Sequence, residues 1–472
     1  MITPLLLEAE ASGIFYASEG VWNAVFQMGL IALVILAANI LRRLPFIRKS
    51  LMPVSVIAGF LMLIAKLILR GFGVRDFFNM ELMDTLVYHC IALGFIAMSL
   101  RAAEPGAKKG AGVRSGAMIV GAYLVQAFVG LVITIGIGLL IKPDLFKAAG
   151  LLLPMGYGQG PGQANNIGMT YESYGFAGGK SFGLALAAAG YICACVVGVI
   201  VLNFWRRRGL VKSASGQEGR ADELPASYFQ SEGEIPISDS IDKLSIQMGL
   251  VLVVYLVTYL VTKGLTSLLE AAAPGVASLL NPMLWGFNFI IGSAVAMLTK
   301  LLLDGAHKRG WMKRRYRNSY LLNRLSGFFF DVMIVAGIAC IDPEDLSGLW
   351  VPFALLAAAG GVVTWFYLKR VCRSVCPDYY REGLISMYGM MTGTIGSGIL
   401  LLREIDPDFK TPAANNLVTG SSSGILFGAP LLILVTTAAK SDALLYAVMG
   451  IIVVYFALLM LFIRLAGRKK DR

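Results

Sequence analysis

The chain has 472 residues, of which 57% are hydrophobic and only 15% charged, with a mean hydropathy of +0.71. Soluble globular proteins average about 45–50% apolar and about 25% charged residues. This composition excludes a soluble enzyme, a disordered chain and a disulfide-rich secreted scaffold. It predicts an all-α polytopic membrane protein, because a backbone in lipid must satisfy its own hydrogen bonds and helices do so.

The excess of basic over acidic residues, a formal net charge of +12, also has a membrane explanation. Lys and Arg collect in the cytoplasmic loops of bilayer proteins. We therefore expect no nucleic-acid partner, and we expect the basic run 308–317 to contact anionic lipid headgroups. The six cysteines mostly lie in apolar runs, and the pair in a basic segment, Cys372 and Cys376, has no nearby histidine and makes a poor zinc site. We therefore expect inert thiols and no metal site.

Eleven apolar runs approach the length of about 20 helical residues that crosses a hydrocarbon core of about 30 Å. In chain order they cover residues 22–41, 52–69, 86–100, 117–141, 181–205, 246–261, 279–302, 326–341, 349–368, 419–437 and 444–463. Two further apolar stretches, 148–168 and 383–402, are rich in glycine and carry polar residues in mid-run. Each of these two stretches either crosses the membrane or enters it and returns.

The distribution of charge favours a return to the same side for both stretches. The N-terminal segment 1–21 has acids but no Lys or Arg, so it is not expected to be a signal peptide and is placed outside. Most Lys and Arg residues then fall in cytoplasmic segments. If only the first stretch crossed, the basic runs 206–208 and 313–315 would lie outside, against the positive-inside rule. We therefore predict two re-entrant hairpins and a cytoplasmic C-terminus.

The two halves of the chain follow the same plan. Each predicted repeat, 22–205 and 246–437, has four spans, a re-entrant hairpin and a fifth span, and an odd number of spans inverts the second copy. A cytoplasmic linker, 206–245, joins them, and residues 438–472 add an unpaired eleventh helix and a basic tail. Inverted repeats are typical of secondary transporters, which bind substrate near the midplane where broken helices from both repeats meet.

The first hairpin offers polar side chains and exposed backbone for binding substrate. Its glycines defeat a continuous helix, and the freed amides and carbonyls can bind a carboxylate or a cation. The alternative is that the glycines only permit tight helix packing, but Gln and Asn in an apolar run are costly without a function. The candidates here are Gly158, Gln159, Gly160, Gln163, Asn165 and Asn166.

The second hairpin combines hydroxyl groups with bare backbone over residues 392–398, and such oxygen ligands suit a small cation such as sodium. Packing is again the alternative. Arg403 either clamps a substrate carboxylate through two hydrogen bonds or anchors the hairpin end at the membrane surface. We predict Thr394, Ser397, Arg403 and Asn415 as substrate-binding residues, and Thr392, Gly393, Thr394 and Asn416 as cation-binding residues.

Asp331 is an acid inside a predicted span, where a carboxylate is a functional candidate by default. It either belongs to the cation site, binds a protonated amine or carries a proton, or else it caps the helix near its cytoplasmic end. His89, in the third span, is expected to be a packing residue.

Several strings resemble the glutamate:sodium symporter family, over roughly residues 22–437. They are the run Phe330–Val335, the hairpin sequence Leu153–Gly158, and the stretch Thr392–Arg403 continuing into Asp406 and Pro407. The resemblance implies sodium-coupled uptake of glutamate, or of a related small carboxylate or amino acid, by a homodimer in a bacterial inner membrane. It also implies an elevator motion, in which a core carrying both hairpins slides against a dimerising scaffold. No cofactor beyond the coupling ion is implied.

The hairpin tips differ from those of familiar members of that family. The first reads Gly-Tyr-Gly-Gln-Gly-Pro rather than a paired glycine with His and Thr, and the second reads Thr-Ile-Gly-Ser in place of an Ala-Thr-Pro-Thr-like tip. A proton-coupled carrier of organic anions or amino acids is therefore the alternative. An intramembrane enzyme would need a compact set of titratable groups, which the spans do not offer, so we predict no catalytic residues. A passive channel would not need two hairpins of opposite orientation.

Overall fold

The computed structural model describes residues 19–74, 77–101, 111–211, 240–272, 288–312, 316–406 and 410–468, with 274, 277, 281 and 284–286. Most of the predicted N-terminal segment 1–21 and of the linker 206–245, and the end of the tail, lie outside the described residues. So do the basic run 313–315 and Pro407.

Every regular element in the described residues is helical, and no strand occurs there. The elements are α2 (Glu19–Leu41), α3 (Pro45–Lys49), α4 (Val54–Gly71), α5 (Met80–Leu100), α6 (Ala111–Leu140), η2 (Lys147–Leu151), η3 (Pro154–Gly158), α7 (Pro161–Ser173), α8 (Gly179–Arg207), α9 (Ser240–Ala272), α11 (Asn288–Lys308), α12 (Ser319–Ala339), α13 (Trp350–Val375), η6 (Pro377–Tyr379), α14 (Tyr380–Thr392), α15 (Ile395–Arg403), α16 (Ala413–Ala438) and α17 (Asp442–Arg468).

Ten helices of the described part are long and apolar enough to cross a membrane. α16 consists of two helical parts, Ala413–Ile425 and Phe427–Ala438, bent by 54° at the break between them, and it makes an eleventh span if both parts cross together. Pro430 lies four residues beyond the bend at residue 426. Proline has no backbone N–H, so the helical hydrogen bond from position 430 to the carbonyl of residue 426 is missing. The chain is therefore an all-α, multi-pass membrane protein.

Several helices extend beyond the apolar runs that predicted them. α5 begins at Met80 rather than at 86, because the Asn79 side chain accepts a hydrogen bond from the Leu82 amide and caps the helix there. α12 begins at Ser319 rather than at 326, with the same cap between Asn318 and Leu321. Hydropathy detects only the apolar middle of a helix, whereas its capping residues set its ends.

Two boundary predictions differ more widely from the structure. The sixth helix, α9, runs from Ser240 to Ala272 and so exceeds the predicted 246–261 at both ends. The seventh, α11, covers Asn288–Lys308 and so ends six residues beyond the predicted 279–302, whereas several residues of the predicted first part, between 279 and 287, lie outside the described ones. Their extra C-terminal turns carry charged residues, which the apolar runs exclude: Lys263 and Glu270 of α9, and Asp304 and Lys308 of α11.

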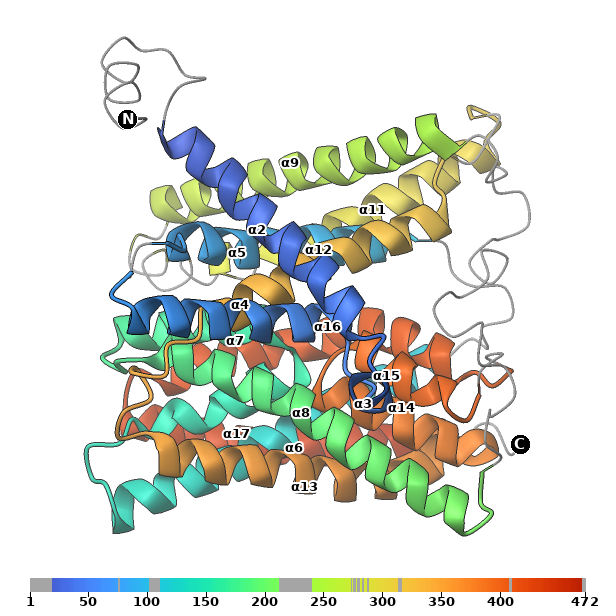
Figure 1. Cartoon of the computed structure of the whole chain (residues 1–472). Coiled ribbons are helices and arrows are strands. Elements are labelled where there is room, and N and C mark those ends of the chain that lie inside the picture. The colour runs from blue at the N-terminus through green and yellow to red at the C-terminus, as the bar shows by residue number, and fades with distance from the viewer. Residues whose placement is uncertain are drawn as a thin grey trace.

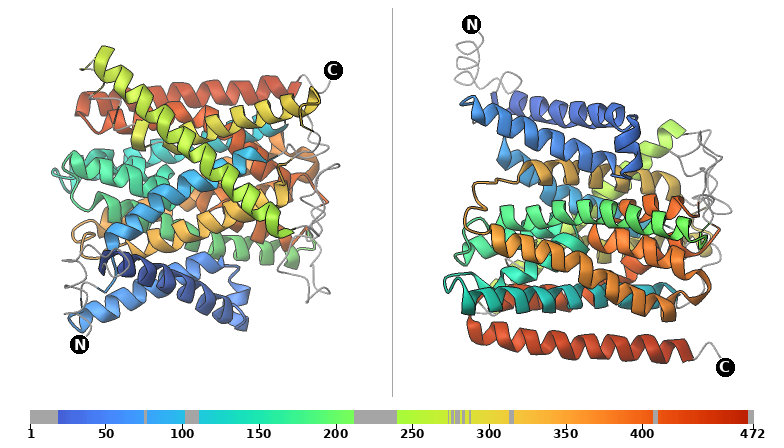
Figure 2. Two further views of the ribbon diagram at one scale, coloured as in Figure 1. Left: turned by 90° about the horizontal axis from the view of Figure 1, so that it is seen from above. Right: turned by 60° about the horizontal axis from the view of Figure 1, so that its bottom comes forward.

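The helices form two bundles (Figures 1 and 2). The upper bundle, named for its place in Figure 1, contains α2, α4, α5, α9, α11 and α12, with α12 packed closely on α5 and α4. The lower bundle contains α6 to α8 and α13 to α17, with α6 packed on α16, α13 and α17. The three helices that open each half of the chain lie in the upper bundle, and the glycine-rich segments lie in the lower one.

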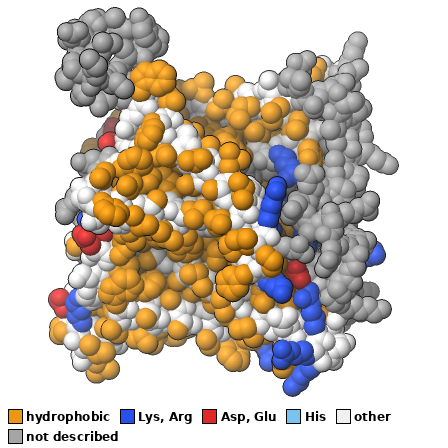
Figure 3. Space-filling view, in the orientation of Figure 1, with side chains coloured by type: hydrophobic (Ala, Val, Ile, Leu, Met, Phe, Trp, Pro, Cys, Tyr) orange, Lys and Arg blue, Asp and Glu red, His pale blue; other side chains and the backbone are white. Residues whose placement is uncertain are grey.

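The two ends of the bundles differ in charge, and large apolar side chains cover the face between them (Figure 3). We call the end where α8 finishes the basic end, since Lys and Arg side chains gather there. The opposite end, where α8 begins at Gly179, we call the acidic end; Asp144, Asp342 and Glu344 lie in its connections. Exposed leucines at 252, 256 and 260 on α9 are typical of a lipid-facing surface.

Candidate functional site

The glycine-rich segment 147–173 enters the lower bundle from the acidic end along α6. The Thr134 hydroxyl donates to the Lys147 carbonyl at 2.6 Å. Deeper in, Gly130 and Gly150 approach so closely that a Cβ on either would lie 2.0–2.2 Å from the carbonyl oxygen of the other. The inward leg, formed by η2 and η3, therefore runs against α6 backbone to backbone.

The same segment returns to the acidic end as α7, antiparallel to α8. Close approaches pair Ala164 with Gly183 and then Gly168 with Gly179. Phe146, just before the segment, stacks on Phe176, just after it, with ring centroids 5.0 Å apart. Entry and exit therefore lie side by side, and the chain turns between Gly158 and Pro161.

The second glycine-rich segment is a helical hairpin that enters from the basic end. Its legs, α14 and α15, touch where a Cβ on Gly389 would lie 2.9 Å from the Gly398 Cα atom. At its base, Arg206 of α8 forms an ion pair with Glu404 at 2.5 Å. Its tip is formed by Gly393 and Thr394, between the two legs.

The two tips meet near the middle of α8. A Cβ on Gly190 would lie 2.3 Å from the Thr392 carbonyl oxygen and 3.3 Å from the Tyr157 ring. Gly160 has a φ of +85°, and a Cβ there would lie 3.9 Å from the Tyr191 hydroxyl and 4.0 Å from Cγ2 of Thr394. Glycine suits both positions, at 190 for lack of space and at 160 for its backbone conformation.

Gln126 of α6 links the two tips. Its amide nitrogen donates to the Met391 carbonyl at 3.0 Å and to the Thr364 hydroxyl at 2.8 Å. Its carbonyl oxygen lies 3.0 Å from where a Cβ on Gly158 would sit. Because Gln126 is completely buried, this one side chain fixes the tip of one hairpin and faces the other.

Several polar atoms around the tips are buried with no hydrogen-bond partner in the described structure. They are the hydroxyls of Tyr191 and Ser397, the Gln126 carbonyl oxygen and both polar atoms of the Gln163 side chain. These side chains are at most 2% exposed. An unpaired buried polar group costs about 1–3 kcal/mol, so such groups usually serve bound water or a ligand. The tips therefore offer a binding place for a small polar molecule.

Asp331 faces this place from the upper bundle. It lies on α12, close to Ser55 of α4 and to Tyr191 of α8. Asp331 is an exposed residue of the upper bundle that lies near Tyr191 of the lower bundle.

The structure brings part of the predicted site together. Six predicted residues form the two tips: Gly158, Gln159, Gly160, Thr392, Gly393 and Thr394. Ser397 lies one turn from the second tip, where its hydroxyl is 2.8 Å from the position of a Cβ on Gly393. Asp331 belongs to the same region from the other bundle.

Three predicted residues lie instead at the basic end, near the base of the second hairpin. Arg403 ends α15, about 12 Å along the helix axis from its first residue. Asn416 donates to the Tyr379 hydroxyl at the base, and Asn415 is its neighbour on α16. This placement favours the anchoring interpretation of Arg403 and separates both asparagines from the tips, because a helical hairpin keeps its base and its tip apart.

Asn165 and Asn166 lie on α7, nearer the acidic end. The Asn166 amide donates to the Gly286 carbonyl at 3.0 Å, and the Asn165 amide to the Met169 sulfur at 3.4 Å. They therefore lie along the wall of the lower bundle and not at its tips.

Sequence reasoning missed Gln126, Tyr191 and Ser55. Gln126 carried a usable signal, since it is an amide side chain inside the apolar run 117–141. Nothing in the sequence marked Tyr191 or Ser55, whose importance comes only from helices that are distant in sequence.

A separate cavity of about 340 Å³ lies in the upper bundle between α5 and α9. The His89 ring is hydrogen-bonded to the Tyr255 hydroxyl at 2.6 Å in its wall. Among the described residues, no group of three or more His, Cys, Asp or Glu side chains is arranged to hold a metal ion.

No protein-family model matches the chain, and no curated protein matches it in sequence. We therefore infer the function from the site alone. There, two chain reversals that enter from opposite ends expose backbone and polar side chains in the middle of an apolar molecule.

Proposed function

We propose that this protein is a secondary active transporter that binds a small carboxylate or amino acid between the two tips. The observation that carries the proposal is the meeting of both tips at Gly190. Secondary transporters bind their substrates at such breaks, because a broken helix frees backbone groups inside the membrane.

In a bilayer, the segments 147–173 and 380–403 would be re-entrant hairpins from opposite faces. Each half of the chain contributes three helices to the upper bundle and two helices with a hairpin to the lower bundle. This division supports two inverted repeats, with α17 as an addition.

The division into bundles also supports an elevator motion. Both hairpins belong to the lower bundle, so this bundle would carry the substrate as one body, and the upper bundle would be the frame. The distance between Asp331 on the frame and Tyr191 on the moving body would change during the cycle. A homodimer formed through the frame is part of the proposal.

The helix ends at the site suit an anionic substrate with a cation. Helices α7 and α15 begin at the tips, at Pro161 and Ile395. The free amides and the helix dipole at each N-terminus attract a carboxylate there. The C-terminus of α14 brings the carbonyl groups near Thr392 to the same place. We propose sodium as the cation, bound by these oxygens with Thr394 and Asp331.

The second candidate is a proton-coupled carrier, and the accessible position of Asp331 favours it. A single carboxylate at the interface of two bundles can take up a proton on one side and release it on the other.

Purified protein in liposomes tests the proposal. Radiolabelled glutamate should accumulate under an inward sodium gradient and should equilibrate without concentrating when sodium is equal on both sides. Accumulation driven equally by a proton gradient without sodium would contradict the sodium claim, and single-channel currents would contradict the carrier. Gly190→Ala should abolish accumulation, whereas Gly249→Ala on α9, where nothing lies within 4 Å of the added Cβ, should preserve it.

A further inference from the structure

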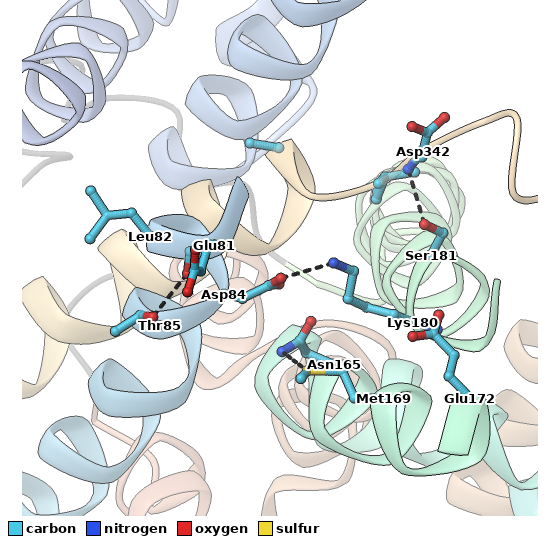
Figure 4. A network of polar contacts seen from close by, with 12 residues as sticks. Glu81, Leu82, Asp84, Thr85, Asn165, Met169, Glu172, Lys180, Ser181 and Asp342 are labelled. Atoms are coloured by element: carbon cyan, nitrogen blue, oxygen red, sulfur yellow. Dashed lines mark hydrogen bonds and ion pairs between the residues drawn. The ribbon is translucent and has the colours of Figure 1, made fainter. Parts of the chain in front are cut away.

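An ion pair joins the two bundles at the acidic end. Lys180, at the start of α8 in the lower bundle, donates to Asp84 of α5 in the upper bundle at 2.9 Å (Figure 4). Both side chains are 21% exposed, so the pair is largely enclosed. It therefore closes the bundle interface at this end.

The next residue of α8 strengthens the closure. The Ser181 hydroxyl donates to the Asp345 carboxylate at 2.6 Å and accepts from the Asp342 amide at 3.2 Å. Both partners belong to the connection 340–349, which leads from α12 of the upper bundle to α13 of the lower one. Arg70 of α4 holds the same connection through Asp342 at 2.7 Å.

An unpaired polar side chain of α7, Asn165, lies between the tips and this closure, whereas Gln163, two residues earlier, points about 200° away from it on the helix. α7 runs from Gly160 to the acidic end, and it packs on the upper bundle where a Cβ on Gly162 would meet Ile91. Gln163 and Asn165 on α7 are each 1% exposed. Both polar atoms of the Gln163 side chain, and the Asn165 carbonyl oxygen, have no partner in the described structure.

One oxygen of Asp84 is also buried without a partner. Figure 4 shows the Asn165 amide beneath the Asp84–Lys180 pair. An amide oxygen of Asn165 and a carboxylate oxygen of Asp84, both buried without a partner at the contact of α7 with α5, are costly unless they are solvated at some stage of the working cycle.

We propose that the contact of α7 with α5 beside Asn165 is an access route to the site from the acidic end, and that the Asp84–Lys180 pair is its lock. The inference rests on the proposed transport function. The solute using the route is the small carboxylate or amino acid of that function. Opening requires the pair to separate as α7 and α8 move against α5 and α12, and the side chain of Asn165 then faces water and solute.

A cysteine at position 165 reports on the route. The variant Asn165→Cys, in full-length protein reconstituted in vesicles, is treated with a membrane-impermeant thiol reagent from the side of the acidic end. Protein without this substitution measures the background from the native thiols, five of which are buried. With the lock intact, we expect slow labelling.

Adding Lys180→Met should raise the labelling rate by about ten-fold, since a lost contact of ordinary strength shifts a conformational equilibrium by that order. The charge-exchanged variant, Asp84→Lys with Lys180→Asp, should return labelling to the slow rate. The matched control is Lys147→Met, which removes the ion pair with Asp442 at the same end but within the lower bundle. It should leave the rate unchanged.

An unchanged rate in Lys180→Met, or an equal rise in Lys147→Met, would overturn the lock. Labelling needs no transport, so the two proposals can fail separately. Uptake without a labelling response would overturn the route alone, whereas a labelling response without uptake would overturn the transporter and leave the route in place.

Discussion

Gly130 and Gly150 set how deeply the first hairpin enters the lower bundle. Their backbones touch, and no side chain fits between them. Gly136, two turns further along α6, has nothing within 4 Å of an added Cβ. These two glycines of α6 therefore have different roles: the contact with Gly150 requires glycine at position 130, whereas Gly136 only weakens the helix.

Gly130→Ala should lower the free energy of unfolding by about 1–3 kcal/mol, the usual cost of overpacking. Gly136→Ala should raise it by up to about 1 kcal/mol, because alanine is the better helix former. Thermal unfolding in detergent measures both. Equal midpoints for the two variants would show that the close approach is absent.

Asp331→Asn should abolish the dependence of uptake on the coupling ion. Asparagine keeps the shape of the side chain but carries no charge for a cation or proton. The initial uptake rate, measured against sodium concentration and against pH, tests this. Asp378→Asn, an exposed carboxylate at the basic end, is the control and should behave as wild type.

Asp342, in the connection 340–349, has a pKa below its usual value. Burial alone would raise this pKa, but the Glu344 amide and the Arg70 guanidinium bind the carboxylate and outweigh burial. A carboxyl group with a lowered pKa stabilises the fold above its unfolded pKa of about 3.9, and this contribution is lost as pH falls through the native pKa. At pH values below about 4 we expect the thermal midpoint of unfolding to fall, and we expect a smaller fall in Asp342→Asn. An identical pH profile in the variant would contradict this.

At the scale of elements, helix ends are satisfied by side chains from other helices. Lys66 of α4 donates to the carbonyls of Ala339 and Ile341, both at 2.7 Å, where α12 ends. These carbonyls have no partner within their own helix. A lysine in the middle of an apolar run is therefore explained by the end of a helix that is distant in sequence.

Lys66→Met should destabilise the protein by about 1–3 kcal/mol, because two enclosed carbonyls lose their donor. Lys263→Met is the matched control, since this exposed lysine only contacts the Tyr259 ring and its loss should change little. The thermal midpoint in detergent distinguishes them. A wild-type midpoint for Lys66→Met would mean that water replaces the donor.

Element prediction succeeded where the signal was local. Apolar runs located the long helices, and glycine clusters located both interrupted segments, since helix breaking depends on the residues at the break. The ends of α5 and α12 were missed because their caps, Asn79 and Asn318, lie outside the apolar runs. The extra length of α9 was missed because its outer turns are polar.

At the scale of the whole molecule, charge separates the two ends (Figure 3). We propose that the basic end is cytoplasmic, in keeping with the positive-inside rule. The N-terminal end of α2 lies with the acidic end, because Asn79 donates to Asn23 near the start of α2.

Asp144→Cys, in a connection at the acidic end, should react with a membrane-impermeant thiol reagent in intact cells. Arg373→Cys, in the last turn of α13 at the basic end, should react only after the membrane is permeabilised. The reverse pattern would invert the topology and would overturn the assignment of inside and outside for both hairpins.

The sequence by itself determined the class of protein and the places where its helices break. Both follow from local chemistry, because lipid demands internally bonded helices and glycine interrupts them wherever it clusters. Only the tertiary structure decided which residues share the site. Arg403, Asn415 and Asn416 are near the second hairpin in sequence but lie at its base, whereas Gln126 and Tyr191 reach the tips from separate helices. Such meetings depend on how whole bundles pack, and no pattern within a single segment encodes that.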